Sequence, residues 1–268
     1  MAGPTTAERD AGEGYKDSVY GPLSGRRLPR LRMFIILAVA LLLLGGGSLW
    51  VLYGSSWLRA ERVTVSGTDV LTEAQVRTAA QIPLGEPLIS VDTDEIASRL
   101  RRKLPRIDSV DVARSWPHGI ELKVTERTPV LIVEDTGNAG NYVEVDAKGV
   151  RFATVSHAPE GVPVLELALS SPGSAAASLR RFGEERLVRE AVRVARAIPA
   201  AAARDTRVVK VRSYDDISLE LTGGRTVAWG CGEKGRAKAR TLTALMKAAP
   251  GARNFDVRVP TAPASSGS

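Results

Sequence analysis

The chain has 268 residues, a formal net charge of +7, one cysteine and two histidines. This length suits one or two domains of ordinary size, and a single thiol excludes an intrachain disulfide, so the folded parts depend on their apolar cores. With two histidines and one cysteine, the sequence also excludes the His and Cys ligand clusters of common structural metal sites.

The chain begins with a polar segment, residues 1–32, which has too few large apolar side chains to form a core. We expect it to be a disordered cytoplasmic head. Its last cations are positioned to act as a topology signal that keeps the N-terminus in the cytoplasm. These cations are Arg26, Arg27, Arg30 and Arg32.

The uncharged run Met33–Tyr53 predicts a transmembrane helix. At about 1.5 Å of rise per residue it spans about 31 Å, close to the hydrocarbon core of a bilayer. Trp50, Tyr53 and Trp57 lie at its outer end, where aromatic rings favour the headgroup region. The alternatives are a cleaved signal peptide and a buried core helix, and the length of the run disfavours both.

Residues 57–127 predict a small α+β domain. Alternation at 62–66 indicates a strand, and Thr72 with Gln75, then Asp92 with Glu95, have the spacing of capping boxes at two helix starts. The alternating runs 110–113 and 120–125 predict a hairpin. The expected order is strand, helix, helix, strand, strand, with both helices on one face of the sheet.

Residues 128–260 predict a second, mixed α/β domain with a mainly antiparallel sheet. Helical periodicity covers 184–198 and 234–249, and a low-complexity loop covers 170–178. We expect residues 261–268 to form a disordered tail. The strands are expected at 130–134, 142–146, 150–152, 162–167, 208–212, 217–221, 226–229 and 254–259.

The C-terminal third is basic: Leu179–Pro260 holds 18 Lys and Arg against 9 Asp and Glu. Outside the membrane, this excess favours an acidic partner, anionic lipid headgroups or acidic wall polymers, whereas the compartment argues against nucleic acid. Solvated helix faces rich in arginine, with no binding role, explain the excess of positive charge equally well.

Nothing in the sequence predicts a reaction centre. His118 lies in a tight turn and His157 in a Pro-rich loop, neither with a partner at metal-ligand spacing, and no activated-nucleophile motif is present. Cys231 is interpreted as a small residue at a strand end. We therefore expect no enzyme, catalytic residue, metal, cofactor or small-molecule substrate.

Three segments follow patterns that occur together in one known protein family. The first segment is similar to R-x-W-P-x-x-(L/I)-x-x-x-V-x-E-R-x-P-V, and the others to V-D-x-x-G-V and (Y/F)-(I/V)-D-V-R-x-P. The matching residues are Arg114, Trp116, Pro117, Ile120, Val124, Glu126, Arg127, Pro129 and Val130; Val145, Asp146, Gly149 and Val150; and Phe255, Asp256, Val257, Arg258 and Pro260. These segments resemble the FtsQ/DivIB family of bacterial division proteins, and the strand order after a single anchor resembles the POTRA domain, a polypeptide-binding module. Leu131 and Glu166 depart from the usual residues of that family.

The resemblance implies a non-enzymatic scaffold of the division machinery, enriched at the septum, that binds FtsB- and FtsL-type membrane proteins and, through its POTRA domain, other division proteins. We expect 254–259 to be an edge strand to which a partner segment adds a further strand. The partner-binding residues are then Phe255, Asp256, Val257, Arg258 and Val259. The alternative is that 254–259 is an internal strand whose match to the family reflects packing.

Two other classes remain open. The first is a module that binds anionic wall polymer or lipid headgroups through the basic C-terminal domain. The second is a translocation assembly factor, since POTRA domains also occur in that class, but about 130 residues after the POTRA region are too few for the long barrel that such proteins carry.

Overall fold

The structure is a computed structural model that describes residues 28–168 and 180–267, with side chains from Leu31 onward. Most of the expected head and the low-complexity loop Ser170–Ser178 lie outside the described residues. The described chain divides into two compact units, which meet between Ser55 and Ser56.

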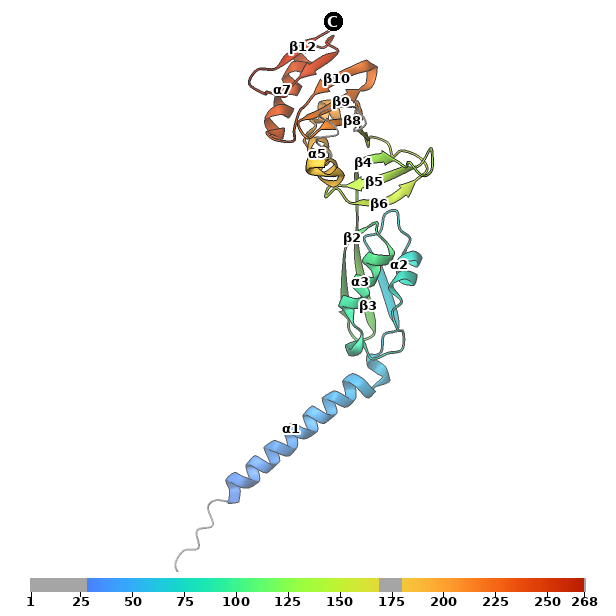
Figure 1. Ribbon diagram of the computed structural model, residues 1–268. Helices are drawn as coiled ribbons and strands as arrows, with labels where there is room; N and C mark the ends of the chain where they lie inside the picture. Colours follow the sequence, from blue (N-terminus) through green and yellow to red (C-terminus); the bar gives the residue numbers. More distant parts are fainter. Residues whose placement is uncertain (1–27, 169–179, 268) are drawn as a thin grey trace, which may run out of the picture. The chain divides into compact units, whose positions relative to one another are not determined.

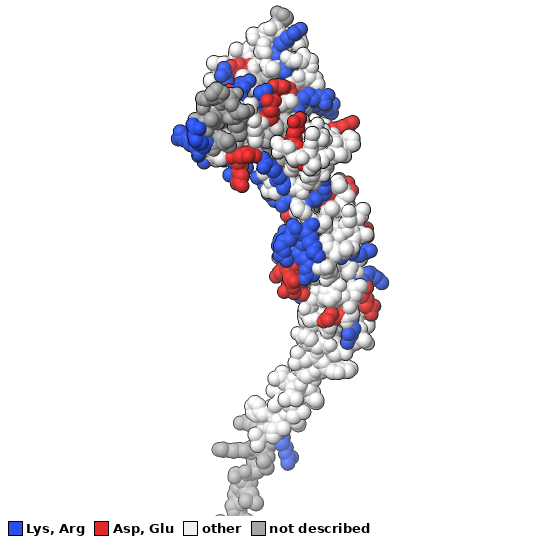
Figure 2. All heavy atoms as spheres, turned by 45° about the vertical axis from the view of Figure 1, so that its right-hand side comes forward, with Lys and Arg blue, Asp and Glu red and all other residues white. Residues whose placement is uncertain are grey.

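The first unit contains one long helix, α1 (Leu28–Gly54). Its stretch Leu31–Gly54 has a mean hydropathy of 2.5, and none of it is buried against other parts of the protein. Figure 2 shows that it is almost free of charged side chains. By length and composition this helix can cross a bilayer, as the sequence predicts.

The second unit begins with a three-stranded sheet in the order β1-β3-β2. Strand β1 is parallel to β3 and β2 is antiparallel to it, while α2 contacts β1 and α3 contacts β2 (Figure 1). A short 3-10 helix, η1 (Ser56–Leu58), precedes this sheet. The elements are β1 (Arg62–Ser66), α2 (Glu73–Ala80), α3 (Thr93–Lys103), β2 (Ile107–Ser115) and β3 (Gly119–Glu126).

Both helix starts lie where the capping pattern predicts them. Thr72 and Gln75 make both reciprocal bonds of a capping box. Asp92 accepts the N–H groups of Asp94 and Glu95, but the Glu95 side chain bonds Arg99 instead of returning to the cap. The strand, helix, helix, strand, strand order is confirmed, and it encloses a core built around Val76, Leu88, Leu100, Ile120 and Leu122.

A nine-stranded sheet follows, in the order β12-β11-β10-β9-β8-β7-β4-β5-β6. Five of its pairings are antiparallel and three are parallel, so the sheet is mainly antiparallel. Its strands are β4 (Pro129–Glu134), β5 (Tyr142–Asp146), β6 (Arg151–Val155), β7 (Val164–Leu167), β8 (Thr206–Ser213), β9 (Asp216–Leu221), β10 (Arg225–Ala228), β11 (Asn254–Asp256) and β12 (Ala264–Ser266).

Two helices, α5 (Glu184–Ala197) and α7 (Gly235–Ala248), pack on this sheet and on each other. Helix α5 contacts β4 and β8, and α7 contacts β11; a single turn, α6 (Ala200–Ala203), follows α5. The enclosed core includes Leu131, Val145, Leu187, Leu219, Trp229 and Leu242.

The end of the chain differs from the sequence prediction. Residues 261–268, expected to be a disordered tail, contain strand β12, which pairs with β11. Strand β11 is therefore flanked by β10 and β12 and is not at the sheet edge. It is also shorter than expected and ends at Asp256.

Candidate functional site

The five predicted partner-binding residues follow one another but face different surroundings. Phe255 and Val257 are 2% and 0% exposed, so their side chains belong to the second core and are closed to a partner. Val259 is 56% exposed, Arg258 is exposed and Asp256 is half-buried. Only the last part of the predicted set therefore forms surface.

Asp256 holds Arg258 in place. Its carboxylate accepts bonds from the Arg258 backbone N–H at 3.0 Å and from the guanidinium, the shortest being 2.6 Å from Nη2 to Oδ2. The Arg258 side chain holds the pKa of Asp256 below its usual value, and the same bond raises the pKa of Arg258. The pair stays ionised at neutral pH, with Arg258 presented to solvent in a fixed position.

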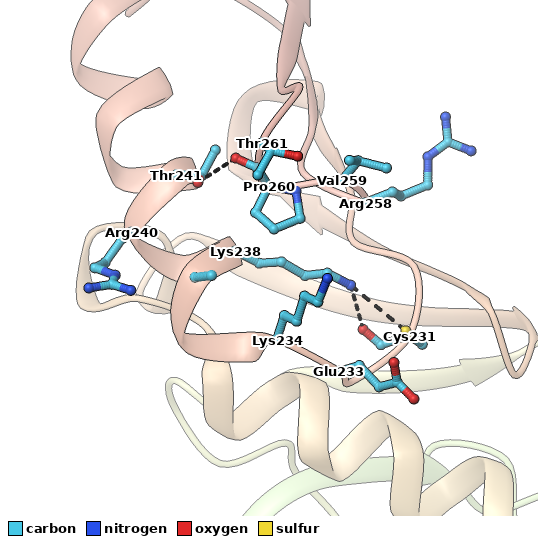
Figure 3. Close-up of a pocket in the computed structure, with 11 residues that line it drawn as sticks. Cys231, Glu233, Lys234, Lys238, Arg240, Thr241, Arg258, Val259, Pro260 and Thr261 are labelled. Carbon is cyan, nitrogen blue, oxygen red and sulfur yellow. Dashed lines mark hydrogen bonds between the residues drawn. The ribbon is translucent and has the colours of Figure 1, made fainter.

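A hollow of about 430 Å³ lies beside Arg258 and Val259, between the start of α7 and the segment that leads to β12 (Figure 3). Four of its lining residues are cations and only Glu233 is acidic, so the hollow favours an anionic segment. The hydroxyl of Thr241 donates to the carbonyl of Pro260 at 3.2 Å, which ties the far wall to α7. The lining consists of Cys231, Glu233, Lys234, Ala237, Lys238, Arg240, Thr241, Arg258, Val259, Pro260 and Thr261.

Lys238, at the floor of this hollow, is a residue that the sequence analysis missed. It is 2% exposed and donates from Nζ to the carbonyl of Trp229 at 2.9 Å and to that of Cys231 at 2.8 Å. Figure 3 shows the bond to Cys231. Its place in the apolar spacing of α7, four residues before Leu242, was the only available signal. The ammonium fixes the loop after β10, which carries Cys231 and Glu233.

Among the described strands, β12 is the last on this side of the sheet, and it follows the wall of the hollow in the chain. Register pairs Phe255 with Ser265 and Asn254 with Ser266. The N–H of Thr226 donates to the Arg253 carbonyl and the N–H of Val257 to the Ala228 carbonyl, so the N–H and C=O of Phe255 face β10 and those of Asn254 face β12. The N–H of Ser266 therefore faces β11, while the N–H of Ser265, at the outer edge of β12, faces outward. An extended partner segment can pair there without displacing any strand.

A second basic surface, the α5 arginine ridge, consists of Arg186, Arg189, Arg193 and Arg196, spaced three, four and three residues apart. Three of these arginines line a hollow of about 640 Å³ together with Arg236 of α7 and Lys148 of the β5–β6 turn. Within the described residues, Arg196 and Arg236 form no ion pair, whereas Arg193 pairs with the buried Glu190 at 3.0 Å. Several of these cations are therefore available to an anion.

Glycine shapes the floor of this second hollow. A Cβ atom at Gly232 would lie 2.6 Å from Arg193 Cδ and 2.7 Å from Glu190 Oε1, so a larger residue would force these two side chains to move. The N–H of Gly232 donates to Glu190 Oε1 at 2.5 Å, which gives the buried carboxylate a second partner.

The remaining candidate residues are the topology arginines, which lie on or before α1, and Cys231, which lines the first hollow. Of the four topology arginines, Arg26 and Arg27 lie outside the described residues, Arg30 is described only as backbone of α1, and Arg32 is exposed on α1. Cys231 is half-buried after β10, on the wall of the first hollow. Among the described side chains, no group of three or more His, Cys, Asp or Glu could hold a metal ion.

The protein is similar to known division proteins along its whole length. Residues 58–127 match the family "POTRA domain, FtsQ-type". Cell division protein FtsQ of Streptomyces coelicolor is 70% identical over the full length of both chains, and that of Streptomyces venezuelae is 56% identical over all of this chain and 99% of the relative. FtsQ of Mycolicibacterium smegmatis is 33% identical over 85% of this chain and 61% of the relative. With a POTRA domain of the FtsQ type and full-length relatives at this identity, the chain belongs to the FtsQ family of bacterial cell division proteins.

Proposed function

We propose that the protein is a non-enzymatic scaffold of the divisome that binds FtsB- and FtsL-type membrane proteins outside the cytoplasmic membrane. It spans the membrane once through α1 with its N-terminus in the cytoplasm, is enriched at the division septum and helps to organise septal wall synthesis. Its POTRA domain offers a second surface for other division proteins. Membership of the FtsQ family and the apolar helix α1 support this proposal.

One observation carries the partner site: β12, the last of the described strands on its side of the sheet, directly follows the segment that lines a hollow rich in cations. A partner segment pairs with the outward N–H and C=O groups of β12, which gives main-chain affinity. Acidic side chains of the same segment approach Arg258 and Arg240, which gives specificity and faster association. Val259 supplies an exposed apolar contact to the partner. The buried side chains of Phe255 and Val257 anchor the protein's own residues 255–259 to its core.

Binding of an FtsB-type extracytoplasmic segment to the full chain in nanodiscs tests this site. Arg258→Glu and Arg240→Glu each reverse one cation of the hollow, and Arg240→Glu leaves the Asp256–Arg258 pair intact. Each should weaken binding at least about tenfold, which corresponds to about 1.4 kcal/mol. Arg207→Glu is the matched control, because Arg207 is exposed on β8, four strands away from β12.

The three variants are first compared by circular dichroism, so that a lost fold is not mistaken for lost contact. Equal affinity of Arg258→Glu, Arg240→Glu and the parent chain would reject this site. An equal loss in all three variants would point to long-range charge rather than to the hollow.

A second candidate function is binding of anionic wall polymer or lipid headgroups, and the α5 arginine ridge favours it. Guanidinium groups match phosphate and carboxylate geometry in a bidentate way. The second hollow offers four guanidinium groups and the ammonium of Lys148. The apolar side chains between them are small, from alanine to valine, which suits a polyanion better than a protein surface with aromatic anchors.

Co-sedimentation with isolated cell walls tests this alternative. The double variant Arg196→Glu/Arg236→Glu changes the two cations of the second hollow that form no ion pair with a described residue, and Arg204→Glu/Arg207→Glu matches its charge at exposed positions elsewhere. Loss of sedimentation in the first variant alone supports polymer binding, and the same loss with anionic vesicles assigns it to headgroups. If both double variants sediment like the parent, the ridge serves only as a solvated face.

A further inference from the structure

One end of the POTRA domain gathers three segments that are distant in sequence. The pairing of Arg62 with Gly119, and of Ser115 with Gly119, places the start of β1, the start of β3 and the β2–β3 turn together. The backbone N–H groups of Glu61 and Arg62 both donate to the carbonyl of His118. We call this the turn end; it comprises η1 (Ser56–Leu58), residues 83–87 and residues 115–119.

Hydrogen bonds hold these segments together. His118 Nδ1 donates to the Trp57 carbonyl at 2.7 Å, since a carbonyl oxygen can only accept, and the two rings meet edge-on with centroids 6.3 Å apart. Residues 83–87 join through the bonds between Ala60 and Gly85 and between Ala60 and Glu86, while Arg59 Nη1 donates to the Gly85 carbonyl. The turn end is thus a built surface.

This surface exposes three large apolar side chains. Trp57 is 64% exposed, Leu84 61% and Trp116 49%. After α1, the described part of the chain has only three other exposed large apolar residues, Val70, Val150 and Val259. Exposing tryptophan and leucine side chains to water is unfavourable. Their concentration at one end of the domain indicates a surface that another molecule or a membrane covers.

Chain length limits what can cover it. Helix α1 ends at Gly54, three residues before Trp57, and three residues reach at most about 11 Å. The turn end therefore cannot leave the neighbourhood of the point where the chain emerges from α1. This argument uses only the length of the connection and holds for any orientation of the POTRA domain.

From these observations we infer that the turn end is a membrane-docking surface, whose Trp57, Leu84 and Trp116 side chains enter the headgroup region of the phospholipid bilayer that α1 crosses. Tryptophan has an apolar body and a polar N–H, which suits this boundary. Arg59 and Arg62 are balanced by Glu61 and Glu86, so apolar insertion, rather than attraction to anionic lipid, drives the contact. The inference rests on the proposed span of α1 and is independent of strand addition at β12.

The four tryptophans of the chain allow a direct test. The full chain, labelled with 5-fluorotryptophan and placed in nanodiscs, gives one fluorine resonance per tryptophan, assigned with single Trp→Phe variants. A gadolinium-chelating lipid headgroup then enhances the relaxation of nearby fluorines. Trp50 of α1 is the positive reference and Trp229, which is fully buried in the second core, is the negative one.

We expect the relaxation enhancement of Trp116 to exceed that of Trp229 severalfold and to be the same in zwitterionic and anionic discs. Enhancement of Trp116 no larger than that of Trp229, with Trp50 enhanced, overturns the docking surface and leaves this end for a protein partner. If Trp50 itself shows none, the proposed span of α1 fails, and this outcome is distinct from failure of the docking surface alone.

A pair of matched variants tests the third side chain. Leu84→Ser should reduce the enhancement at Trp116 severalfold, because it removes part of the inserted surface. Val70→Ser is the control, because Val70 is equally exposed at 62%, but its own backbone N–H bonds Glu126, at the opposite end of β3. Equal effects of the two variants would exclude Leu84 from the docking surface.

Discussion

Lys238 is an unusual residue for a protein core, because its ammonium is buried beside two carbonyls rather than beside a carboxylate. A buried charge is expensive unless hydrogen bonds compensate it. Here the bonds also fix the loop that forms one wall of the first hollow. The stability of the core and the shape of the candidate site therefore depend on the same side chain.

The substitution Lys238→Met keeps the length of the side chain but leaves the carbonyls of Trp229 and Cys231 without their donor. We expect the free energy of unfolding to fall by about 1–3 kcal/mol. Chemical denaturation of the full chain in nanodiscs measures this change. Lys247→Met, at an exposed position on the last turn of α7, should change it by less than about 0.5 kcal/mol.

Two carboxylates, Glu126 of the POTRA domain and Asp146 of the second sheet, make the stability of the fold depend on pH in the acid range. Burial opposes ionisation of Glu126, but three backbone N–H groups, from Asp69, Leu71 and Val70, outweigh it and lower its pKa. Burial likewise opposes ionisation of Asp146, but bonds from the Val150 N–H, the Arg127 side chain and the Lys148 N–H lower its pKa.

Because both folded pKa values lie below the unfolded ones, the stability that these groups contribute is fully present above pH values near the ordinary 4.5 and 3.8. It is lost as the pH falls through the folded pKa values. Glu126→Gln/Asp146→Asn should therefore be less stable than the parent at pH 7, and the difference should shrink on acidification. Parallel stability curves across the acid range would contradict this assignment.

At the scale of elements, the sequence predicted helices and most strands because their signals are local. Thr72 and Asp92 mark helix starts through bonds that span three residues, and alternation marks strands such as β3 and β9. Strand β12 could not be predicted in this way. Its residues, Ala-Ser-Ser, have no apolar alternation, and they are ordered only by pairing with β11.

The same limit explains the error in the candidate site. The motif around Asp256 and Arg258 predicted an edge strand there, but which strand forms an edge is a property of the whole sheet. Arg240, Lys234 and Lys238 come from α7 and the residue before it, and only the folded chain brings them beside Arg258. Their spacing in the sequence gave no signal of that contact.

Proline substitutions distinguish the two faces of β12. Ser265→Pro removes an outward N–H and should weaken binding of an FtsB-type segment at least about tenfold, while pairing with β11 persists. Ser266→Pro removes an N–H that faces β11 and should detach the strand, raising amide exchange at Asn254. Hydrogen exchange and binding are measured on the same samples. Unchanged binding by Ser265→Pro would exclude addition at this edge.

At the scale of the whole molecule, an ion-pair network joins the POTRA domain to the second sheet. Arg106 pairs with Glu144 at 2.5 Å, and Arg127 pairs with Asp146 and, at 3.0 Å, with Asp108. Lys148 of the β5–β6 turn also reaches Asp108, at 2.5 Å. Glu144 and Asp146 are buried, so the arginines are needed to compensate them.

This network gives the adjacent Glu126 and Arg127 of the family pattern complementary structural tasks. The Glu126 carboxylate accepts hydrogen bonds from backbone N–H groups of the loop after β1 and so holds that loop in place. Arg127 forms an ion pair with Asp146 of the next domain. The two domains are therefore joined by ion pairs as well as by the chain connection between them.

Removing Arg127 should uncouple the two parts. Arg127→Leu leaves Asp146 buried without its main cation, so we expect a loss of about 3 kcal/mol, or about 6–12 °C in Tm. Differential scanning calorimetry of the full chain in nanodiscs should show the single unfolding transition splitting into two, because each core then melts separately. Arg207→Leu controls for the loss of one exposed arginine and should leave the transition intact. An unsplit transition within about 2 °C of the parent would mean that the connection between Glu126 and Pro129, not this ion pair, couples the two cores.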